Sequence, residues 1–143
     1  MAQLAVWQAG GWLFLVCGMI IGIGVDLCEA SRWQGLLDRY GHKAVRRILS
    51  GEEANSLLSS PDRSLAEKAA GRWALREAVG KAMGTGLSGW DLRDLRYEKG
   101  EAVAVGKLKK KMDDMGIGRV HATLSHDCGI SVAIVVLESR NQI

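Results

Sequence analysis

The stretch that decides the fold is WALREAVGKAMGTG, residues 73–86, which predicts the second half of a long helix and its end. Small and apolar side chains recur at helical spacing along one stripe of this helix, at Ala66, Ala70, Trp73, Ala74 and Ala78. Glu77 and Lys81 continue the same stripe. Charges on a core-facing stripe are unfavourable unless they are paired, bound to a metal or open to a cleft. The pattern therefore indicates either a functional cleft or a simple i,i+4 ion pair on a partly exposed turn.

Both ends of this helix carry boundary signals. Residues 64–67, SLAE, match a capping box and put the first helical turn just after Ser64. Gly84, Thr85 and Gly86 end the helix near Met83. Glycine at this point is typical of a helix C-cap, and it also allows a backbone to come close enough to hydrogen-bond a phosphate. Both interpretations fit the sequence.

A second acidic motif follows the apolar run at residues 20–25, which reads as a buried strand. Asp26 opens a D-x-x-E pattern, so it is either an ordinary helix N-cap or a cation ligand at a strand end. Mg²⁺ prefers oxygen ligands and typically takes one or two carboxylates together with substrate phosphates. If Asp26 and Glu77 meet in space, they supply that number beside Lys81. The two motifs together suggest a divalent cation that holds a phosphorylated substrate.

The remaining chain predicts helices first and strands afterwards. Helices are expected over residues 28–40, 42–49, 51–58 and 64–83, and a charged helix or turn over residues 107–115. Hairpins are expected from residues 91–98 with 101–105, and from 120–125 with 131–138. This order indicates a single α+β domain whose antiparallel-rich sheet packs against one long helix and several shorter ones.

A third polar cluster lies at residues 125–127, at the end of a predicted strand. Three such residues most commonly form a polar turn, and the functional alternative is that Ser125 and His126 face a phosphate. A serine-hydrolase triad is excluded because three consecutive residues cannot adopt its geometry. His42 and His121 have no supporting neighbours and are expected to be structural or surface residues.

The charge of the chain is concentrated in one region. The net charge is only +3, but a basic patch at residues 30–50 sets five cations against the single acid Asp38, namely Arg32, Arg39, Lys43, Arg46 and Arg47. Such a patch suits an acidic protein partner or a phosphate-bearing ligand, although it also suits a solvated helix face. A nucleic-acid role is the weakest alternative, because no stacking aromatics interleave with the patch. Three cysteines without a CxxC pair favour the reducing cytoplasm over a disulfide framework or a structural zinc site.

The amino-terminal segment carries no charged residue before Asp26, and residues 4–25 are long enough to span a bilayer. A signal peptide fits poorly because no basic residue precedes the apolar run. We expect one domain over residues 19–143, preceded by an atypical apolar extension at residues 1–18. A membrane-tethered form that uses this extension is the less favoured alternative.

At these motifs the chain resembles the holo-acyl carrier protein synthases, the short-chain 4'-phosphopantetheinyl transferases. The resemblance rests on four segments in the family's order and spacing, at residues 21–32, 46–53, 73–86 and 120–127. It implies a 4'-phosphopantetheinyl transferase-like fold and the transfer of the phosphopantetheine arm of coenzyme A to a serine of apo-acyl carrier protein. Two departures are visible: Arg76 stands where the family usually has a lysine, and Ala102 replaces a common proline.

The resemblance also implies roles for individual residues. It assigns Asp26 and Glu77 to a magnesium ion, Lys81 to the active-site lysine, and Gly84, Thr85 and Gly86 to a coenzyme A-contacting turn. Ser125 and His126 are expected near phosphates, with His126 among the catalytic residues. Carrier-protein docking is expected at Arg32, Arg39, Arg46 and Arg47. A homotrimer with active sites between subunits is implied, so Asp26 and Glu77 would act with His126 of another copy. The alternative is a catalytically silent module that binds coenzyme A or a carrier protein.

Overall fold

The computed structural model describes residues 3–9, 12–60 and 64–140. In chain order the elements are β1 (Gln3–Ala9), β2 (Trp12–Gly18), β3 (Ile20–Glu29), α1 (Ala30–Tyr40), α2 (His42–Ile48), α3 (Gly51–Ser59), α4 (Leu65–Met83), the 3-10 helix η1 (Leu92–Asp94), β4 (Leu95–Glu98), β5 (Glu101–Ala104), α5 (Gly106–Asp114), β6 (Ile117–Asp127) and β7 (Ile130–Ser139). The expected order of helices followed by hairpins is confirmed.

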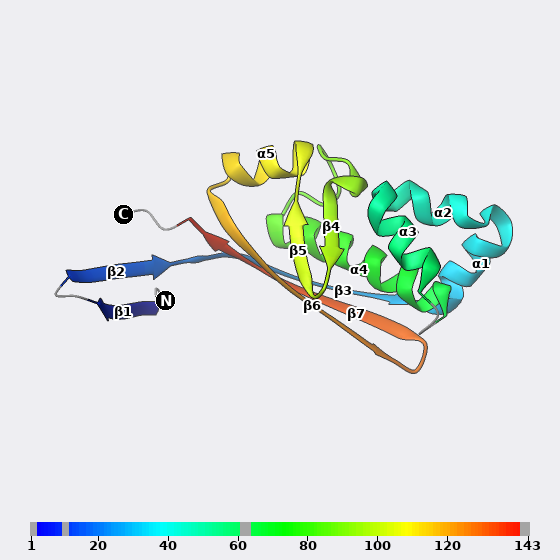
Figure 1. The fold of residues 1–143 in the computed structure, drawn as a ribbon, viewed down its shortest axis with the longest axis horizontal. Coiled ribbons are helices and arrows are strands. Elements are labelled where there is room, and N and C mark those ends of the chain that lie inside the picture. Colours follow the sequence, from blue (N-terminus) through cyan, green and yellow to red (C-terminus); the bar gives the residue numbers. More distant parts are fainter. Residues whose placement is uncertain (1–2, 10–11, 61–63, 141–143) are drawn as a thin grey trace.

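The main sheet has the strand order β3-β7-β6, and both pairings are antiparallel. The helices lie on one side of this sheet, with α4 lying along it (Figure 1). The hairpins β4–β5 and β1–β2 form separate two-stranded sheets. Figure 1 shows β2 running into β3, so the β1–β2 hairpin continues from the start of that strand. Within the described residues, no helix is long and apolar enough to cross a membrane.

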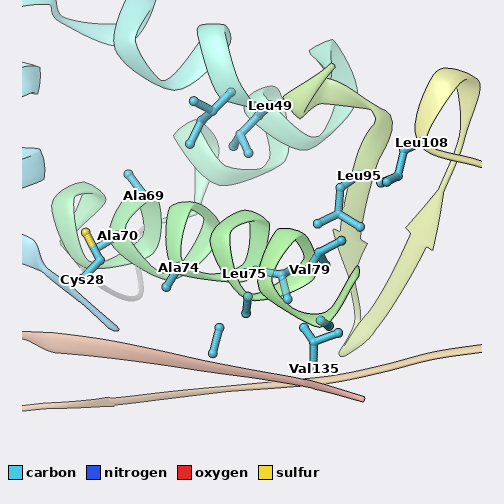
Figure 2. Close-up of a cluster of buried hydrophobic side chains, with 14 of the residues drawn as sticks. Cys28, Leu49, Ala69, Ala70, Ala74, Leu75, Val79, Leu95, Leu108 and Val135 are labelled. Atoms are coloured by element: carbon cyan, nitrogen blue, oxygen red, sulfur yellow. The ribbon is translucent and has the colours of Figure 1, made fainter. Parts of the chain in front are cut away.

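Helix α4 is the centre of the core, because it is covered on two sides. Figure 2 shows Leu49, Leu95 and Leu108 on one side of α4 and Val135 of the sheet on the other. Alanines dominate its buried surface, which allows both layers to approach closely. The buried surface of α4 is therefore wider than the single inward stripe that the sequence predicted, and it includes Arg76.

The helix ends follow the capping signals closely. The Ser64 hydroxyl accepts a hydrogen bond from the Glu67 amide at 3.2 Å, and Gly84 adopts the left-handed conformation after Met83. Ser50 caps α3 in the same way, accepting from the Glu53 amide at 3.4 Å. The expected gap between the helices at residues 51–58 and 64–83 includes residues 61–63, which lie outside the described residues.

Two boundary predictions are wrong. Residues 92–94 form η1 rather than the start of the strand expected from residue 91, so β4 begins only at Leu95. The other error concerns a candidate site residue. The first strand runs on to Glu29, and α1 begins at Ala30 rather than near Cys28. Asp26 is therefore not a helix N-cap but lies inside β3, opposite Ala133 of β7. The neighbouring strand β7 pairs with β3 along this whole length, and the ladder hydrogen bonds outweigh the local D-x-x-E signal.

Candidate functional site

Two glycines bring α4 down onto β3. A Cβ added at Gly22 or Gly24 would lie only 1.9 Å from the carbonyl oxygens of Ala82 and Ala78 respectively. Only a residue without a side chain permits this approach of strand and helix. Because side chains alternate along a strand, Asp26 shares the face of Gly22 and Gly24 and therefore points toward α4. The glycine-rich strand thus delivers a carboxylate beneath the last turns of the helix.

The structure joins Asp26 to Lys81. The Lys81 ammonium donates to Asp26 Oδ1 at 2.7 Å and to the Val25 carbonyl at 3.1 Å. Glu77 lies one turn before Lys81 on the same face of α4. The hydrogen bond to Asp26 raises the pKa of Lys81, and the charges of Asp26 and Glu77 add to this effect. Two carboxylates that are far apart in the sequence thus act on one ammonium group.

This donor set fits a hard divalent cation in its chemistry. Asp26 and Glu77 are partly buried carboxylates, and Lys81, whose side chain is 52% exposed, provides the positive charge beside Asp26. Such a cation needs one or two protein carboxylates and completes its ligands with water and phosphate. Among the described residues no three acidic, histidine or cysteine side chains gather at one point. The pair is therefore suited to a cation shared with a substrate rather than to a closed protein cage.

The turn after α4 uses its amides as a helix cap. The amides of Thr85 and Gly86 donate to the Gly80 carbonyl at 3.2 and 3.1 Å, and the Gly84 amide donates to the Lys81 carbonyl at 3.0 Å. A Cβ at Gly80 would lie 2.6 Å from the Gly86 backbone, so the turn folds back tightly on the helix. These amides are therefore used inside the turn, and the Thr85 side chain is exposed beside them.

Ser125 and His126 do not converge within one chain. His126 lies on the α4 face of the sheet, where a Cβ at Gly71 would lie 2.8 Å from its ring. The Ser131 hydroxyl donates to the Glu67 carbonyl at 3.2 Å, so its oxygen accepts from His126 Nδ1 at 2.7 Å. Ser125, the preceding strand residue, is exposed on the opposite face.

His126 is also distant from the carboxylate pair of its own chain. It packs at Gly71, ten residues before Lys81, which corresponds to roughly 15 Å along the helix axis at 1.5 Å per residue. A site that combines His126 with Asp26 and Lys81 therefore needs a second copy of the chain.

Part of the basic patch surrounds an apolar pocket of about 540 Å³ between α1, α2 and α4. Arg32, Lys43 and Arg47 line it together with apolar and aromatic side chains, which are Trp33, Leu36, Tyr40, Ala44, Ile48, Trp73 and Leu92. The Arg32 guanidinium lies 5.9 Å from the centre of the Trp73 ring. We name this cavity the α1–α2 pocket.

Two of the predicted docking arginines lie outside the pocket lining. Arg39 stacks on Tyr40, with its guanidinium 6.0 Å from the ring centre. Arg46 turns toward α3 and donates to Asn55 Oδ1 at 3.0 Å. The sequence interpretation missed the apolar part of the pocket, although Trp33, Leu36 and Tyr40 recur at i, i+3 and i+7, which is the signal of one helix face.

Comparison with known proteins agrees with this architecture. Residues 22–110 match the model of the 4'-phosphopantetheinyl transferase superfamily. A holo-[acyl-carrier-protein] synthase from Cutibacterium acnes is 42% identical over 123 residues, which are 84% of this chain and 99% of that protein.

Solved structures give the same result. The synthase from Neisseria meningitidis superposes with a TM-score of 0.75 at 29% identity, over 85% of this chain and 100% of that chain. A synthase from Bacillus anthracis in complex with coenzyme A has a TM-score of 0.66 at 33% identity, over 85% of this chain and 99% of that chain. The transferase-like α+β fold expected from the resemblance is confirmed. The chain belongs to the 4'-phosphopantetheinyl transferase superfamily.

Proposed function

We propose that this chain transfers the 4'-phosphopantetheine group of coenzyme A to a serine of an apo-acyl carrier protein. The serine oxygen forms a bond to the phosphorus that bears pantetheine, the bridging P–O bond of the pyrophosphate breaks, and adenosine 3',5'-bisphosphate leaves. The observation that carries this proposal is the convergence of Asp26 and Lys81 at 2.7 Å, with Glu77 on the adjacent turn. The identity to a named holo-acyl carrier protein synthase over nearly its whole length supports it.

Asp26 and Glu77 are the residues that would hold Mg²⁺. Bound there, the ion would supply neutralising charge to the pyrophosphate and to the leaving bisphosphate. Phosphoryl-type transfer depends on positioning and charge neutralisation more than on covalent help from the protein. The two carboxylates therefore serve to fix the diphosphate end of coenzyme A over α4.

Lys81 provides a mobile positive charge in the same place. Its ammonium is half exposed, so it can turn from Asp26 to the oxygens on which negative charge develops. Thr85 and the turn from Gly84 to Gly86 border the same helix end and contact coenzyme A in this proposal. A carboxylate of the pair can accept the serine proton, and Mg²⁺ bound there would supply a water as an alternative acceptor.

The α1–α2 pocket is the proposed docking surface for the carrier protein. Its basic lining residues suit an acidic partner, and its aromatic ones can contact an apolar side chain presented by a helix of that partner. Arg32 and Arg47 act from the pocket lining, while Arg39 and Arg46 extend the positive surface along α1 and α2. In this arrangement the positive charges attract the acidic carrier protein, and the pocket fixes the position in which it docks.

The proposed active enzyme is a homotrimer with active sites between subunits. The sheet face opposite α4 is apolar and uncovered within the described residues, and its exposed side chains are Ile21, Ile23, Val25, Leu27 and Ile134. A contiguous apolar face of this kind marks an interaction surface. Assembly through this face would bring copies of the chain together, and a site that joins His126 to the carboxylates needs such a second copy.

The proposed transferase domain is residues 19–143. The backbone of Met19 already joins the sheet, since its carbonyl accepts from the Ser139 amide at 2.8 Å. Cys28 and Cys128 are free thiols, which suits the proposed cytoplasmic location. A role in fatty acid biosynthesis is proposed from the carrier-protein substrate.

Intact-mass analysis of an apo-acyl carrier protein after incubation with coenzyme A and Mg²⁺ tests the function. We expect a gain of one phosphopantetheine on wild-type incubation and none with Asp26→Ala or Glu77→Ala. The control is Asp114→Ala, an exposed acid on α5 whose only described ion pair is with Lys110, and it should transfer normally. Full activity in both carboxylate variants would remove the metal assignment. Binding of coenzyme A or carrier protein without any mass gain would show a silent binding module instead.

A further inference from the structure

The most deeply buried charge of the described chain lies on the other side of α4, away from the carboxylate pair. Arg76 has 0% exposure, and its guanidinium meets a carboxylate and backbone carbonyls only. Its Nε donates to the carbonyls of Ile48 and Leu92, both at 2.8 Å. Its two terminal nitrogens donate to Arg72 O at 2.9 Å, Leu95 O at 2.6 Å and Glu53 Oε2 at 3.1 Å.

The carbonyls that Arg76 binds belong to three separate elements beside α4. Ile48 ends α2, Leu92 begins η1, and Leu95 begins β4. Two of them, Ile48 and Leu92, also line the α1–α2 pocket. One guanidinium therefore fixes two lining residues of the pocket to the helix that carries Trp73, which also lines it.

The arginine fork is needed for this arrangement. Arginine presents five donors in a rigid planar fan, whereas lysine presents three donors at one point. A lysine at residue 76 could reach only part of the carbonyl set spread over α2, η1 and β4. Glu53, which is buried with Arg76 and also contacts Arg72 Nε at 2.9 Å, provides the counter-charge. Burial lowers the pKa of Arg76, and Glu53 opposes that effect.

We propose that Arg76 is a positioning residue that assembles the α1–α2 pocket for the carrier protein. It acts through Ile48 and Leu92, whose carbonyls it holds, and it does not touch either substrate. The inference rests on the proposed docking function of this pocket. It assigns to Arg76 a specific effect on one of the two substrates, because the coenzyme A site lies on the opposite, sheet-facing side of α4.

The test is the steady-state kinetics of Arg76→Lys with coenzyme A and an apo-acyl carrier protein as the two varied substrates. We expect the KM for the carrier protein to rise about tenfold, the size that follows from losing one or two net hydrogen bonds to a charged donor. The KM for coenzyme A and kcat should stay within about twofold, because binding of only one substrate is weakened. The matched control is Arg93→Lys, the same change next to Leu92 but on an exposed arginine that pairs with Asp91.

The outcomes separate the inference from the proposed function. An inactive wild-type enzyme would overturn the function itself. An active wild type whose Arg76→Lys variant shifts both KM values equally, shifts only kcat, or shifts nothing would overturn the positioning role alone. If Arg76→Lys does not fold, Glu53→Gln replaces it, because this change loosens the guanidinium while keeping an oxygen acceptor. Glu53→Gln should show the same selective rise in carrier-protein KM, and its absence would overturn the role.

Discussion

Replacing Gly24 by alanine tests whether the close approach of β3 and α4 builds the site. The new Cβ would lie 1.9 Å from the Ala78 carbonyl oxygen, whereas real Cβ contacts essentially never fall under 3.0 Å. The obstacle is backbone, so strand and helix must separate by about 1 Å rather than let a side chain rotate away. Asp26 lies two residues further on the same face, and its 2.7 Å contact with Lys81 would then stretch beyond hydrogen-bonding distance.

The expected loss of stability is at the upper end of the range for overpacking. Added groups in a filled core typically cost about 1–3 kcal/mol, and a rigid main-chain obstacle points to about 3 kcal/mol. In urea this corresponds to a transition midpoint lower by roughly 1–2 M, measured at fixed protein concentration because assembly contributes to stability.

Urea unfolding followed by tryptophan fluorescence, together with the carrier-protein mass assay, measures both effects. The matched control is Gly35→Ala in the middle of α1, where a Cβ would meet nothing within 4 Å. That change should stabilise the protein by about 0.5–1 kcal/mol, because alanine is the better helix former. If Gly24→Ala were as stable as wild type and fully active, the glycine contact would not be what brings Asp26 to Lys81, and the reasoning would fail.

Two further predictions concern the sheet face and Lys81. Ile23→Lys puts a charge on the uncovered apolar face, where Ile23 is 63% exposed, so it should dissociate the oligomer, as measured by light scattering, and reduce transfer. The control is Val103→Lys, at a residue that is 49% exposed on the separate β4–β5 hairpin, and it should do neither. An Ile23→Lys protein of unchanged mass would argue against assembly through this face. The pKa of Lys81 is raised above 10.5 by its hydrogen bond with Asp26, so the stability that this pair provides is present below 10.5 and lost as pH rises through the raised value. The difference in urea midpoint between wild type and Lys81→Met should therefore shrink on the alkaline side of 10.5, and a constant difference would contradict the ion pair.

The local signals in the sequence predicted most element boundaries. The serines before α3 and α4 and the glycine after α4 act within a few residues, so their effect is visible in the sequence itself. Asp26 was an exception, because its D-x-x-E pattern predicted a helix start where pairing with β7 extends the strand. Sheet pairing joins residues about a hundred positions apart, and no local window contains that information.

The candidate site was predictable only in part. Asp26, Glu77 and Lys81 were singled out as charges on apolar elements, and the structure brings Lys81 to Asp26 through two glycines whose role was not foreseen. Ser125 and His126 were grouped because they are adjacent in the sequence. Adjacent residues of a strand point to opposite faces, so the β6 assignment itself separates them.

The helical periodicity of the sequence does not predict the burial of Arg76. A single inward stripe describes a helix that lies on one layer, with its other side in water. Helix α4 instead lies between the sheet and the layer that holds Leu49, Leu95 and Leu108, so it has two buried sides (Figure 2). A charge on the second buried side looks like an exposed residue when only one stripe is considered. The burial of Arg76 is explained by its hydrogen bonds, because its guanidinium donates to the carbonyls of Ile48, Leu92 and Leu95. Buried backbone carbonyls of this kind need hydrogen-bond partners. The arginine fork thus matches the number and spread of the acceptors around residue 76, which only the folded chain reveals.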